Sequence, residues 1–438
     1  MSIITVEKLS ELTGERYEAI MQRSMEELGD IYEDMRAICE DIRERGDIVT
    51  LDHYEKYKEG ITAADLKVTE DEIEAAYDEV PEDVVEHLKF AAANIEKFHA
   101  AQFERDMWSM EIAPGLLAGR VVRPVDSAGC YIPGRQASYP SSVLMTILPA
   151  KAAGVEQIVA CTPPNEGMTA NPTSLVAADL AGCHDIYKIG GPWAIASMAY
   201  GTESVPQVNT IVGPGNKYVT AAKMAVFGTV SIDAPAGPSE ILILADDSAN
   251  PDWLAIDFLS QAEHDQDAAA VLVTASEELA NATAEAIQRA FDAADRQEIL
   301  RPALENNSAI ILTSDLDEAI EFTNEYATEH LEIAMDEPML LLPRIKHAGS
   351  IFLGHYAPVP AGDYASGTNH VLPTGLTAKM FSGLSIDNFL KKPTFQLLSK
   401  EGLAHLAPAV MGLAEAEGLP MHGEAVRVRI DDTRTRGE

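Results

Sequence analysis

The sequence has no long apolar run and no recognisable export signal. Across its 438 residues, no apolar stretch approaches the roughly 20 residues that a helix needs to span a bilayer. The first residues show no basic segment followed by a long apolar one, which is the pattern of a secretory signal. We therefore expect a cytoplasmic protein that does not bind membranes.

Basic residues are scarce. The chain has 32 Lys and Arg against 70 Asp and Glu, which gives a formal net charge of −38. Such a surface repels phosphate backbones, so nucleic acid is not an expected partner. Salt screens the self-repulsion of an acidic surface, which favours a salt-rich cytoplasm over a merely acidic protein in an ordinary one.

Cysteine is also scarce, and several catalytic motifs are missing. The four cysteines, Cys39, Cys130, Cys161 and Cys183, form no CxxC pair. Such cysteines are most often buried thiols, so we expect neither a disulfide framework nor a thiolate zinc site. The sequence has no HExxH, GxSxG, Walker or GxGxxG pattern, so no single motif predicts a dinucleotide site.

What the chain does contain is the alternation typical of α/β proteins. Residues 6–103 are acidic, with apolar positions at helical spacing. From about Arg120, short β-branched runs alternate with helical stretches, which predicts parallel strands with right-handed crossovers. The expected strands are 157–161, 185–189, 210–212, 241–244, 270–273, 309–312, 331–334 and 350–353. The helices expected among the later strands are 251–262, 277–293, 316–326 and 337–345.

The predicted fold class is therefore α/β, with two Rossmann-like parallel-sheet domains and a helical N-terminal region. The C-terminal part predicts a helix over 386–417 and a short strand over 425–429. This tail is too small to fold by itself, so we expect it to pack on another domain or another subunit.

Two polar segments have the residue types of a metal or binding site. Gln261 and His264 are three residues apart at a helix end and share a face, although a solvated helix end is the alternative. Asp363 and His370 belong to a segment rich in glycine and polar residues, which predicts a shaped loop. A connection with incidental polar groups is the alternative there.

Two further segments place a carboxylate close to an imidazole. Glu329 and His330 directly precede an apolar strand, so they share one pocket only if they lie at the mouth of that strand. Such a pair can divide acid–base work between two proton transfers, and an ion-paired loop end is the alternative. Glu417 and His422 flank a tight turn near the C-terminus, which a surface turn explains equally well.

A glycine loop follows the strand expected at 210–212. Its sequence is Gly213-Pro214-Gly215-Asn216, and a helix is expected after it. Small residues at this place let backbone N–H groups and the helix N-terminus approach a phosphate.

Together and in this order, these segments resemble the histidinol dehydrogenase family from about Arg120 to His422. The resemblance is carried by Tyr131-Ile132-Pro133-Gly134, Tyr139-Pro140-Ser141-Ser142, Gly213-Pro214-Gly215-Asn216, Gly237-Pro238-Ser239-Glu240, Gln261-Ala262-Glu263-His264-Asp265, Glu329-His330-Leu331-Glu332 and the loop from Asp363 to Thr374. The N-terminal residues match the family only in their helical character.

The resemblance implies a role for each matching position. The ligands of one catalytic zinc would be Gln261, His264, Asp363 and His422. The acid–base residues would be Glu329 and His330. The substrate contacts would be Ser239, Gln261, His264, His330, Asp363, His370, Glu417 and His422. The contacts to NAD would be Tyr131, Trp193 and Asn216.

The resemblance also implies the reaction and the assembly. The reaction is the oxidation of L-histidinol to L-histidine through L-histidinal, with two hydride transfers to two NAD molecules. In the family the C-terminal segment reaches into the site of a partner, which implies a homodimer in which Glu417 and His422 serve the other subunit.

The same resemblance suggests four parts of the chain. Residues 1–25 form an N-terminal helical segment, and residues 385–438 form the segment exchanged in the dimer. Residues 26–136 with 239–384 form a first α/β domain, which carries most of the zinc and acid–base site. Residues 137–238 form a second α/β domain on the NAD side.

Two positions depart from the family pattern. Trp193 stands where the family often has a glutamine that contacts NAD, and an indole cannot accept a hydrogen bond as an amide does. Thr328 replaces a usual proline before Glu329, which alters the stiffness of the loop.

Three other interpretations stay open. The first is a paralogue that oxidises another small alcohol, such as a sulfonated diol. In the second, Cys130 forms a covalent thiohemiacetal with the aldehyde, although no base is evident beside it in the sequence. The third is a non-catalytic zinc-binding protein, and Trp193 is the only residue that supports this interpretation.

Overall fold

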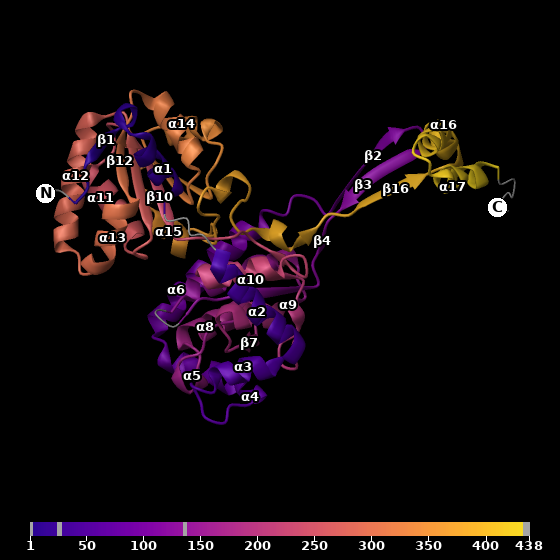
Figure 1. The fold of residues 1–438 in the computed structure, drawn as a ribbon, viewed down its shortest axis with the longest axis horizontal. Helices are drawn as coiled ribbons and strands as arrows, with labels where there is room; N and C mark the ends of the chain where they lie inside the picture. The colour runs from indigo at the N-terminus through magenta and orange to yellow at the C-terminus, as the bar shows by residue number, and fades with distance from the viewer. Residues whose placement is uncertain (1–2, 24–28, 135–137, 432–438) are drawn as a thin grey trace. The chain divides into compact units, whose positions relative to one another are not determined.

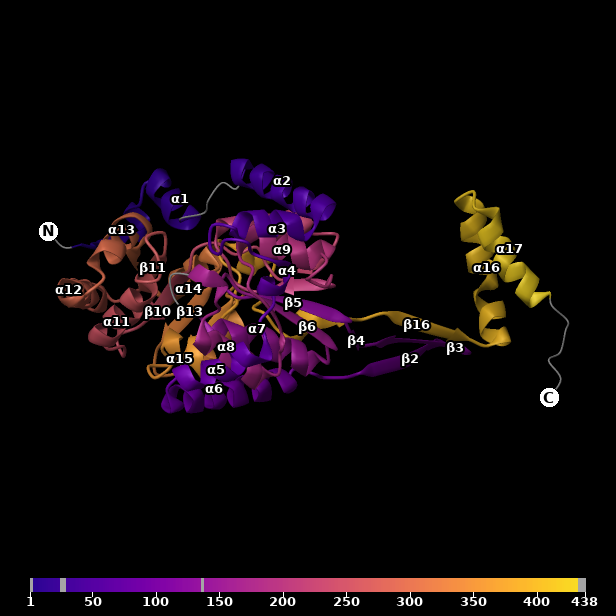
Figure 2. The ribbon, with the colours of Figure 1, turned by 90° about the horizontal axis from the view of Figure 1, so that it is seen from below.

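The computed structural model describes residues 3–23, 29–134 and 138–431, and it confirms the α/β fold class. The chain forms two compact units, which are described separately. Unit 1 comprises Met1–Gln102 and Val125–Phe389, and unit 2 comprises Phe103–Pro124 and Leu390–Glu438. Unit 1 contains two parallel sheets flanked by helices (Figures 1 and 2).

The first sheet of unit 1 has six parallel strands in the order β1-β12-β11-β10-β13-β14. They are β1 Val6–Lys8, β10 Glu240–Ala245, β11 Ala269–Thr274, β12 Ala309–Leu312, β13 His330–Ala334 and β14 Ser350–Leu353. In β10, Ile241 and Ile243 pack in one apolar cluster, whereas Leu242 and Leu244 pack in another. The sheet is thus buried on both faces, which requires the unbroken apolar runs seen in the sequence.

The helices of this sheet are α1 Gly14–Gln22, α11 Pro251–Ala262, α12 Glu277–Ala293, α13 Gln297–Asn307, α14 Leu316–Tyr326 and α15 Val359–Tyr364. Three of them, α11, α12 and α14, have the bounds predicted from the sequence. The helix predicted over 337–345 was wrong, because Pro338 and Pro343 divide it into two 3-10 turns, Pro338–Leu340 and Leu342–Arg344. Residues 6–8, expected to be helical, instead form β1 beside β12.

The second sheet of unit 1 has five parallel strands in the order β7-β6-β5-β8-β9. They are β5 Ser127–Tyr131, β6 Gln157–Cys161, β7 Asp185–Tyr187, β8 Thr210–Val212 and β9 Ser231–Ile232. Their helices are α7 Pro140–Ala153, α8 Pro172–Ala181, α9 Gly191–Tyr200 and α10 Lys217–Val226.

The N-terminal helices pack around this second sheet. They are α2 Gly29–Arg45, α3 Asp47–Tyr54, α4 Ala63–Leu66, α5 Glu70–Glu79 and α6 Glu82–Ala100. Helix α2 contacts α9 and α10, α5 contacts α8, and α6 contacts α7. These helices and β5 thus lie with the five-stranded sheet. The division that groups 26–136 with 239–384 stays a prediction.

Unit 2 combines antiparallel strands with a helical hairpin. The strands are β2 Met107–Ala113, β3 Leu116–Val121, β4 Arg123–Pro124, β15 Leu390–Lys391 and β16 Thr394–Leu398. The helices are α16 Lys400–Ala416 and α17 Pro420–Ile430. The helix predicted over 386–417 was therefore wrong before residue 400, because β16 pairs with β3. The strand predicted over 425–429 is part of α17, which begins at Pro420.

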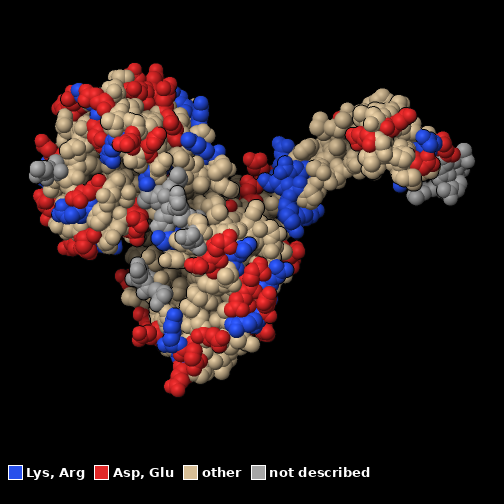
Figure 3. Space-filling model, in the orientation of Figure 1, with Lys and Arg blue, Asp and Glu red and all other residues tan. Residues whose placement is uncertain are grey.

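The surface is consistent with the acidic composition. Acidic side chains are spread over much of the visible face in Figure 3. Within the three described ranges of the chain, no helix combines the length and the apolar character needed to cross a membrane.

Candidate active site

The predicted acid–base pair lies at the amino edge of the six-stranded sheet. His330 is the first residue of β13, and Glu329 directly precedes it. In the pairing of β13 with β10, His330 is opposite Ile241, so Glu240 lies beside Glu329. Both acid–base residues are thus at the mouth of the strand, where Glu329 lies before the strand and is not bound by the alternation of strand faces.

Main-chain groups of Glu240 orient both side chains. The N–H of Glu240 donates to Glu329 Oε2 at 2.8 Å, and Nδ1 of His330 lies 3.1 Å from Glu240 O. Because a carbonyl oxygen only accepts, Nδ1 carries the proton in this bond, so the ring in its neutral form has its lone pair on Nε2. Among the described atoms Nε2 has no hydrogen-bond partner, and it lies 3.7 Å from Asp363 Oδ1. Nε2 of His330 is therefore a buried nitrogen that still has hydrogen-bonding capacity for a substrate group.

Burial and charge shift the pKa values of this pair. Burial raises the pKa of Glu329 to about 8, although the neighbouring His330 opposes the shift. Burial lowers the pKa of His330, but the carboxylates of Glu329 and Asp363 outweigh it and raise the value to about 9. Burial also opposes the charge of Asp363, whose pKa is nevertheless lowered, chiefly by His330. Such shifts in a cluster of converging groups are typical of catalytic sites.

Asp363 and His370 are held together by a shaped loop. Asp363 lies in α15, so it is helical, and the irregular backbone that the sequence predicted begins after Tyr364. Nδ1 of His370 lies 2.9 Å from the carbonyl of Asp363, and Nε2 lies 3.2 Å from Ser142 Oγ. Both ring nitrogens are thus engaged, and burial lowers the pKa of His370. This histidine fits binding and orientation better than proton transfer.

Helix α11 positions Gln261 and His264. The side chain of Asn250 caps its first turn and Pro251 starts it, which fixes where the helix begins. At the other end Gln261 is buried, and its amide nitrogen has no partner among the described atoms. His264 is exposed, binds the carbonyl of Ser260 through Nδ1 at 3.1 Å, and acts electrostatically on Asp363.

These residues fit part of a zinc site. Zinc accepts nitrogen and oxygen ligands, and the Gln261 amide can present its oxygen when it turns by 180°. Within the described ranges, no three His, Cys, Asp or Glu side chains are grouped to hold a metal. The remaining predicted ligand, His422, lies in α17 of unit 2, and Glu417 is the C-cap residue of α16 there.

The segment that contains Ser239 is hydrogen-bonded to Thr374 and Gly375. Thr374 Oγ1 accepts from the N–H of Gly237, and Glu240 Oε1 accepts from the N–H of Gly375 at 3.3 Å. Ser239 thus lies between two anchored neighbours at the same sheet edge as Glu329.

The predicted NAD contacts lie at the carboxyl edge of the five-stranded sheet. Tyr131 ends β5, and its hydroxyl accepts from the N–H of Gly191 at 3.2 Å, at the start of α9. Asn216 follows β8 and caps α10 with its side-chain oxygen. Trp193, in the first turn of α9, stacks on His53 with 3.5 Å between ring centroids. The carboxyl edge of a parallel sheet is where α/β proteins bind dinucleotides.

Comparisons with known proteins agree on one family. Residues 21–430 match the family model described as histidinol dehydrogenase. The chain belongs to the histidinol dehydrogenase family. Histidinol dehydrogenases from Methanothermobacter thermautotrophicus and Methanocaldococcus jannaschii are 48% and 49% identical to it over 425 residues. The alignments cover 97% of this chain and 99% and 98% of those relatives.

A solved structure extends the similarity to the fold. The crystal structure of histidinol dehydrogenase from Elizabethkingia anophelis is 38% identical, with a TM-score of 0.92. The match covers 99% of this chain and 100% of that chain. The chain is therefore an oxidoreductase of histidine biosynthesis.

The structure explains how one departure from the family pattern is accommodated. Thr328 is buried, and its hydroxyl donates to the carbonyl of His330 at 3.1 Å. A proline here would fix the backbone but make no such bond, so the threonine stabilises the turn through its side chain.

Cys130 does not have the environment of a nucleophile. It lies inside β5 with no exposed surface, and burial raises its pKa well above the ordinary value. Because the thiolate is the reactive form, this cysteine is a packed thiol, which argues against the thiohemiacetal alternative.

Sequence reasoning missed two buried ion pairs at these edges. Lys223 pairs with Asp233, and both hold Gly213: its N–H donates to Asp233 at 2.8 Å and its carbonyl accepts from Lys223 at 3.1 Å. The other pair joins Arg23 to Glu240. The one sequence signal for the second pair was that Glu240 belongs to the Gly237–Glu240 segment, in which a role was predicted only for Ser239.

Proposed function

We propose that this chain oxidises L-histidinol to L-histidine in two successive steps, with L-histidinal kept in the site between them. One NAD is reduced in each step. The observation that carries this is the buried pair of Glu329, with its raised pKa, and His330, whose Nε2 has no hydrogen-bond partner among the described atoms. Two groups with different acid–base properties suit a reaction that needs two different proton transfers.

In the first step, Nε2 of His330 accepts the hydroxyl proton of L-histidinol. A hydride leaves the carbinol carbon for the nicotinamide, which gives L-histidinal and NADH. The bond from Nδ1 to Glu240 O holds the imidazole in the tautomer that this transfer requires.

In the second step, Glu329 accepts a proton from water while the water oxygen bonds to the aldehyde carbon. The resulting hydrate anion then loses a hydride from its carbon to a second NAD, and the product is the carboxylic acid. A carboxylate with a raised pKa is a stronger base than an ordinary one, so burial of Glu329 favours this role.

Zinc and a second copy of the chain complete the proposal. Gln261, His264 and Asp363 would hold zinc together with His422 from unit 2 of the other copy. When bound, zinc anchors and orients the imidazole and amine of the substrate. Glu417 of that copy would join Ser239 and His370 as a substrate contact. We also propose that the protein is located in the cytoplasm.

Two alternatives remain for comparison. A paralogue that oxidises another small alcohol, such as a sulfonated diol, would use the same pair with a different pocket. The alternative of a non-catalytic zinc-binding protein requires that Trp193 prevents NAD from binding. The indole of Trp193 stacks on His53, which gives it a defined position.

The deciding experiment counts NADH formed per L-histidinol consumed, with and without zinc chelation, at several salt concentrations. Two NADH, abolished by chelation and restored by zinc, are expected. One NADH would show that the aldehyde is released and that Glu329 does not perform the second step. No NADH at any salt concentration, with turnover of a sulfonated diol, would favour the paralogue, and no binding of NAD would favour the non-catalytic alternative.

A further inference from the structure

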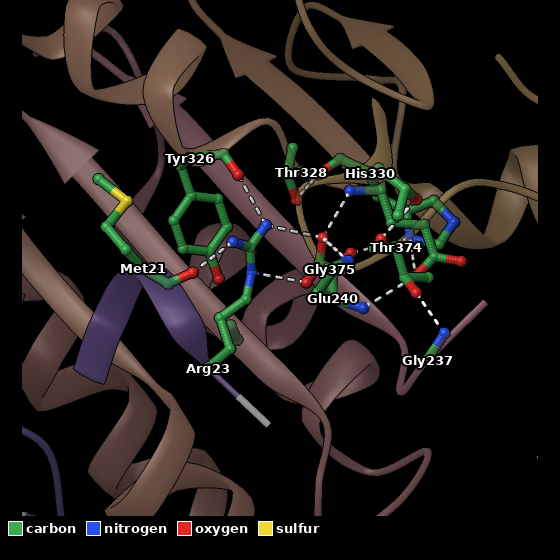
Figure 4. Close-up of polar contacts among 12 residues, drawn as sticks. Met21, Arg23, Gly237, Glu240, Tyr326, Thr328, His330, Thr374 and Gly375 are labelled. Carbon is green, nitrogen blue, oxygen red and sulfur yellow. Dashed lines mark hydrogen bonds and ion pairs between the residues drawn. The ribbon is translucent and has the colours of Figure 1, made fainter. Parts of the chain in front are cut away.

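A buried ion pair lies directly behind the acid–base residues. Nε of Arg23 is 2.6 Å from Glu240 Oε2, and Nη2 donates to Glu240 Oε1 at 2.8 Å (Figure 4). The two side chains are 1% and 3% exposed. Nη2 makes the one hydrogen bond between the two side chains, while Nε is an ion-pair contact without a hydrogen-bond partner among the described atoms. A charge-assisted hydrogen bond of this kind is stronger than one between neutral groups.

Arg23 also holds the end of α14, where the chain turns toward Glu329. Its Nη2 donates to the carbonyl of Tyr326 at 2.7 Å, and its guanidinium lies 3.6 Å from the centroid of the Tyr326 ring. The next residue, Ala327, has φ of 49°, a left-handed conformation that only surrounding contacts maintain. Figure 4 shows the guanidinium between Tyr326 and Glu240.

Glu240 in turn is hydrogen-bonded to Glu329, whose carboxylate is the proposed base. Its Oε1 accepts from the backbone N–H of Glu329 at 3.1 Å, and its own N–H donates to Glu329 Oε2 at 2.8 Å. Each glutamate therefore receives the backbone N–H of the other. This reciprocal pair fixes both the peptide and the carboxylate of Glu329.

We propose that Arg23 and Glu240 are positioning residues, which hold Glu329 in the orientation that activates water in the second oxidation step. The inference rests on the proposed role of Glu329. A buried ion pair is by itself weak evidence for stability. Here the pair is bonded to the peptide of the base, and without Arg23 an uncompensated Glu240 carboxylate would lie beside it.

The test measures oxidation of L-histidinal by zinc-loaded parent and Arg23→Met proteins. We expect kcat to fall about tenfold or more while KM for L-histidinal changes less than about threefold, because the base is displaced but the substrate contacts remain. Arg16→Met is the matched control, since Arg16 lies in α1 of the same segment and pairs with Glu7 at 2.7 Å, away from Glu329. Its kcat is expected to equal that of the parent.

A double-mutant cycle separates positioning from general damage. In a Glu329→Gln background, Arg23→Met is expected to lower kcat by less than about threefold, because the group on which it acts has gone. An equal loss in both backgrounds, or a parent-like kcat in Arg23→Met, would overturn the inference. A parent that does not oxidise L-histidinol would instead overturn the proposed function.

A second variant keeps the test valid if Arg23→Met does not fold. Arg23→Met with Glu240→Gln removes the unpaired charge, and the glutamine carbonyl can still accept from the N–H of Glu329. This protein is expected to fold and to keep the KM of the parent, with a reduced kcat for L-histidinal. A kcat equal to that of the parent would show that the ion pair has no positioning role.

Discussion

The two sheet edges of unit 1 use their backbone N–H groups in different ways. At the amino edge of the six-stranded sheet, the N–H groups of Glu240 and Glu329 bind each other's carboxylates. At the carboxyl edge of the five-stranded sheet, the N–H of Gly191, at the start of α9, donates to the Tyr131 hydroxyl. The N–H of Gly213, in the loop after β8, donates to Asp233, which is paired with Lys223. Both edges bury an ion pair, but the first also buries Glu329, a carboxyl group with a raised pKa, beside His330.

This difference indicates why the acid–base carboxylate lies at one edge and small residues at the other. Carboxylates at an amino edge are stabilised by backbone N–H groups that have no ladder partner there. Their pKa values are then set by how burial, charge and these bonds balance. The NAD site proposed at the carboxyl edge would need close approach to the cofactor instead, and small residues would allow it. Variants should therefore change catalysis at one edge and cofactor binding at the other.

The largest effect is expected from Glu329→Gln. The amide keeps the size of the side chain but cannot accept a proton from water, so oxidation of L-histidinal should fall by ~10²–10⁴-fold. Oxidation of L-histidinol to the aldehyde should fall much less, because His330 is unchanged. Single-turnover assays on each substrate measure the two steps separately.

The control for this variant is Glu337→Gln, in the same unit but beyond β13, just before the 3-10 turn at Pro338–Leu340. It should leave both steps unchanged. Equal losses in both steps for Glu329→Gln would contradict the division of labour between the two residues.

At the other edge, Gly213→Ala should impair cofactor binding strongly. Gly213 has φ of 126°, and a Cβ there would lie 2.1 Å from the carbonyl oxygen of Tyr131. Strain of about 1–3 kcal/mol, increased by this overlap, should raise KM for NAD about tenfold or more. Steady-state kinetics with varied NAD measure the effect.

Gly228→Ala is the matched control, because Gly228 has φ of 98° but a Cβ there meets nothing within 4 Å. It should lower the free energy of unfolding through backbone strain and leave KM for NAD unchanged. A parent-like KM in Gly213→Ala would show that the glycine loop does not approach the cofactor.

The sequence predicted the fold of unit 1 better than that of unit 2. Helix α11 matched to the residue because Asn250 and Pro251 mark its start chemically. In unit 2 the alternation Val426-Arg427-Val428-Arg429 favoured a strand, yet the segment is helical. Gly423 of α17 approaches Met411 and Ala414 of α16, so helix–helix packing decided the outcome over local pattern.

The candidate site shows the same limit. Glu329 and His330 carry a chemical signature in adjacent positions, and the apolar strand after them indicates a sheet edge. Arg23 lies 217 residues from Glu240, and nothing in its neighbourhood indicates a partner. Long-range buried pairs of this kind depend on the tertiary fold, which single-sequence patterns do not contain.

A pH profile should sharpen the contrast between the edges. Burial raises the pKa of Glu329 from 4.5 to about 8, so its basic form is lost as pH falls through about 8. Oxidation of L-histidinal at saturating substrate should therefore drop roughly tenfold per pH unit below that value. KM for NAD should vary little over the same range. A limb near 4.5 would contradict the buried environment of the carboxyl.

A smaller change is expected from Trp193→Gln, which introduces the residue that the family often has. The glutamine loses the stacking on His53 but gains an amide that both donates and accepts. These effects oppose each other, so KM for NAD should change by only about two- to fivefold, with kcat unaffected. Trp193→Ala, which loses the stacking and gains nothing, should show a larger increase in KM than Trp193→Gln.

The smallest effect on activity is expected from Cys130→Ala. The thiol is fully buried in β5, its pKa is raised by burial, and it belongs to neither edge. Loss of the sulfur should lower the free energy of unfolding by about 1 kcal/mol, while kcat for both steps stays the same. Denaturant unfolding and steady-state kinetics on L-histidinol measure the two quantities. A loss of aldehyde oxidation with intact stability would place a covalent step at this cysteine and would remove Glu329 from the second oxidation.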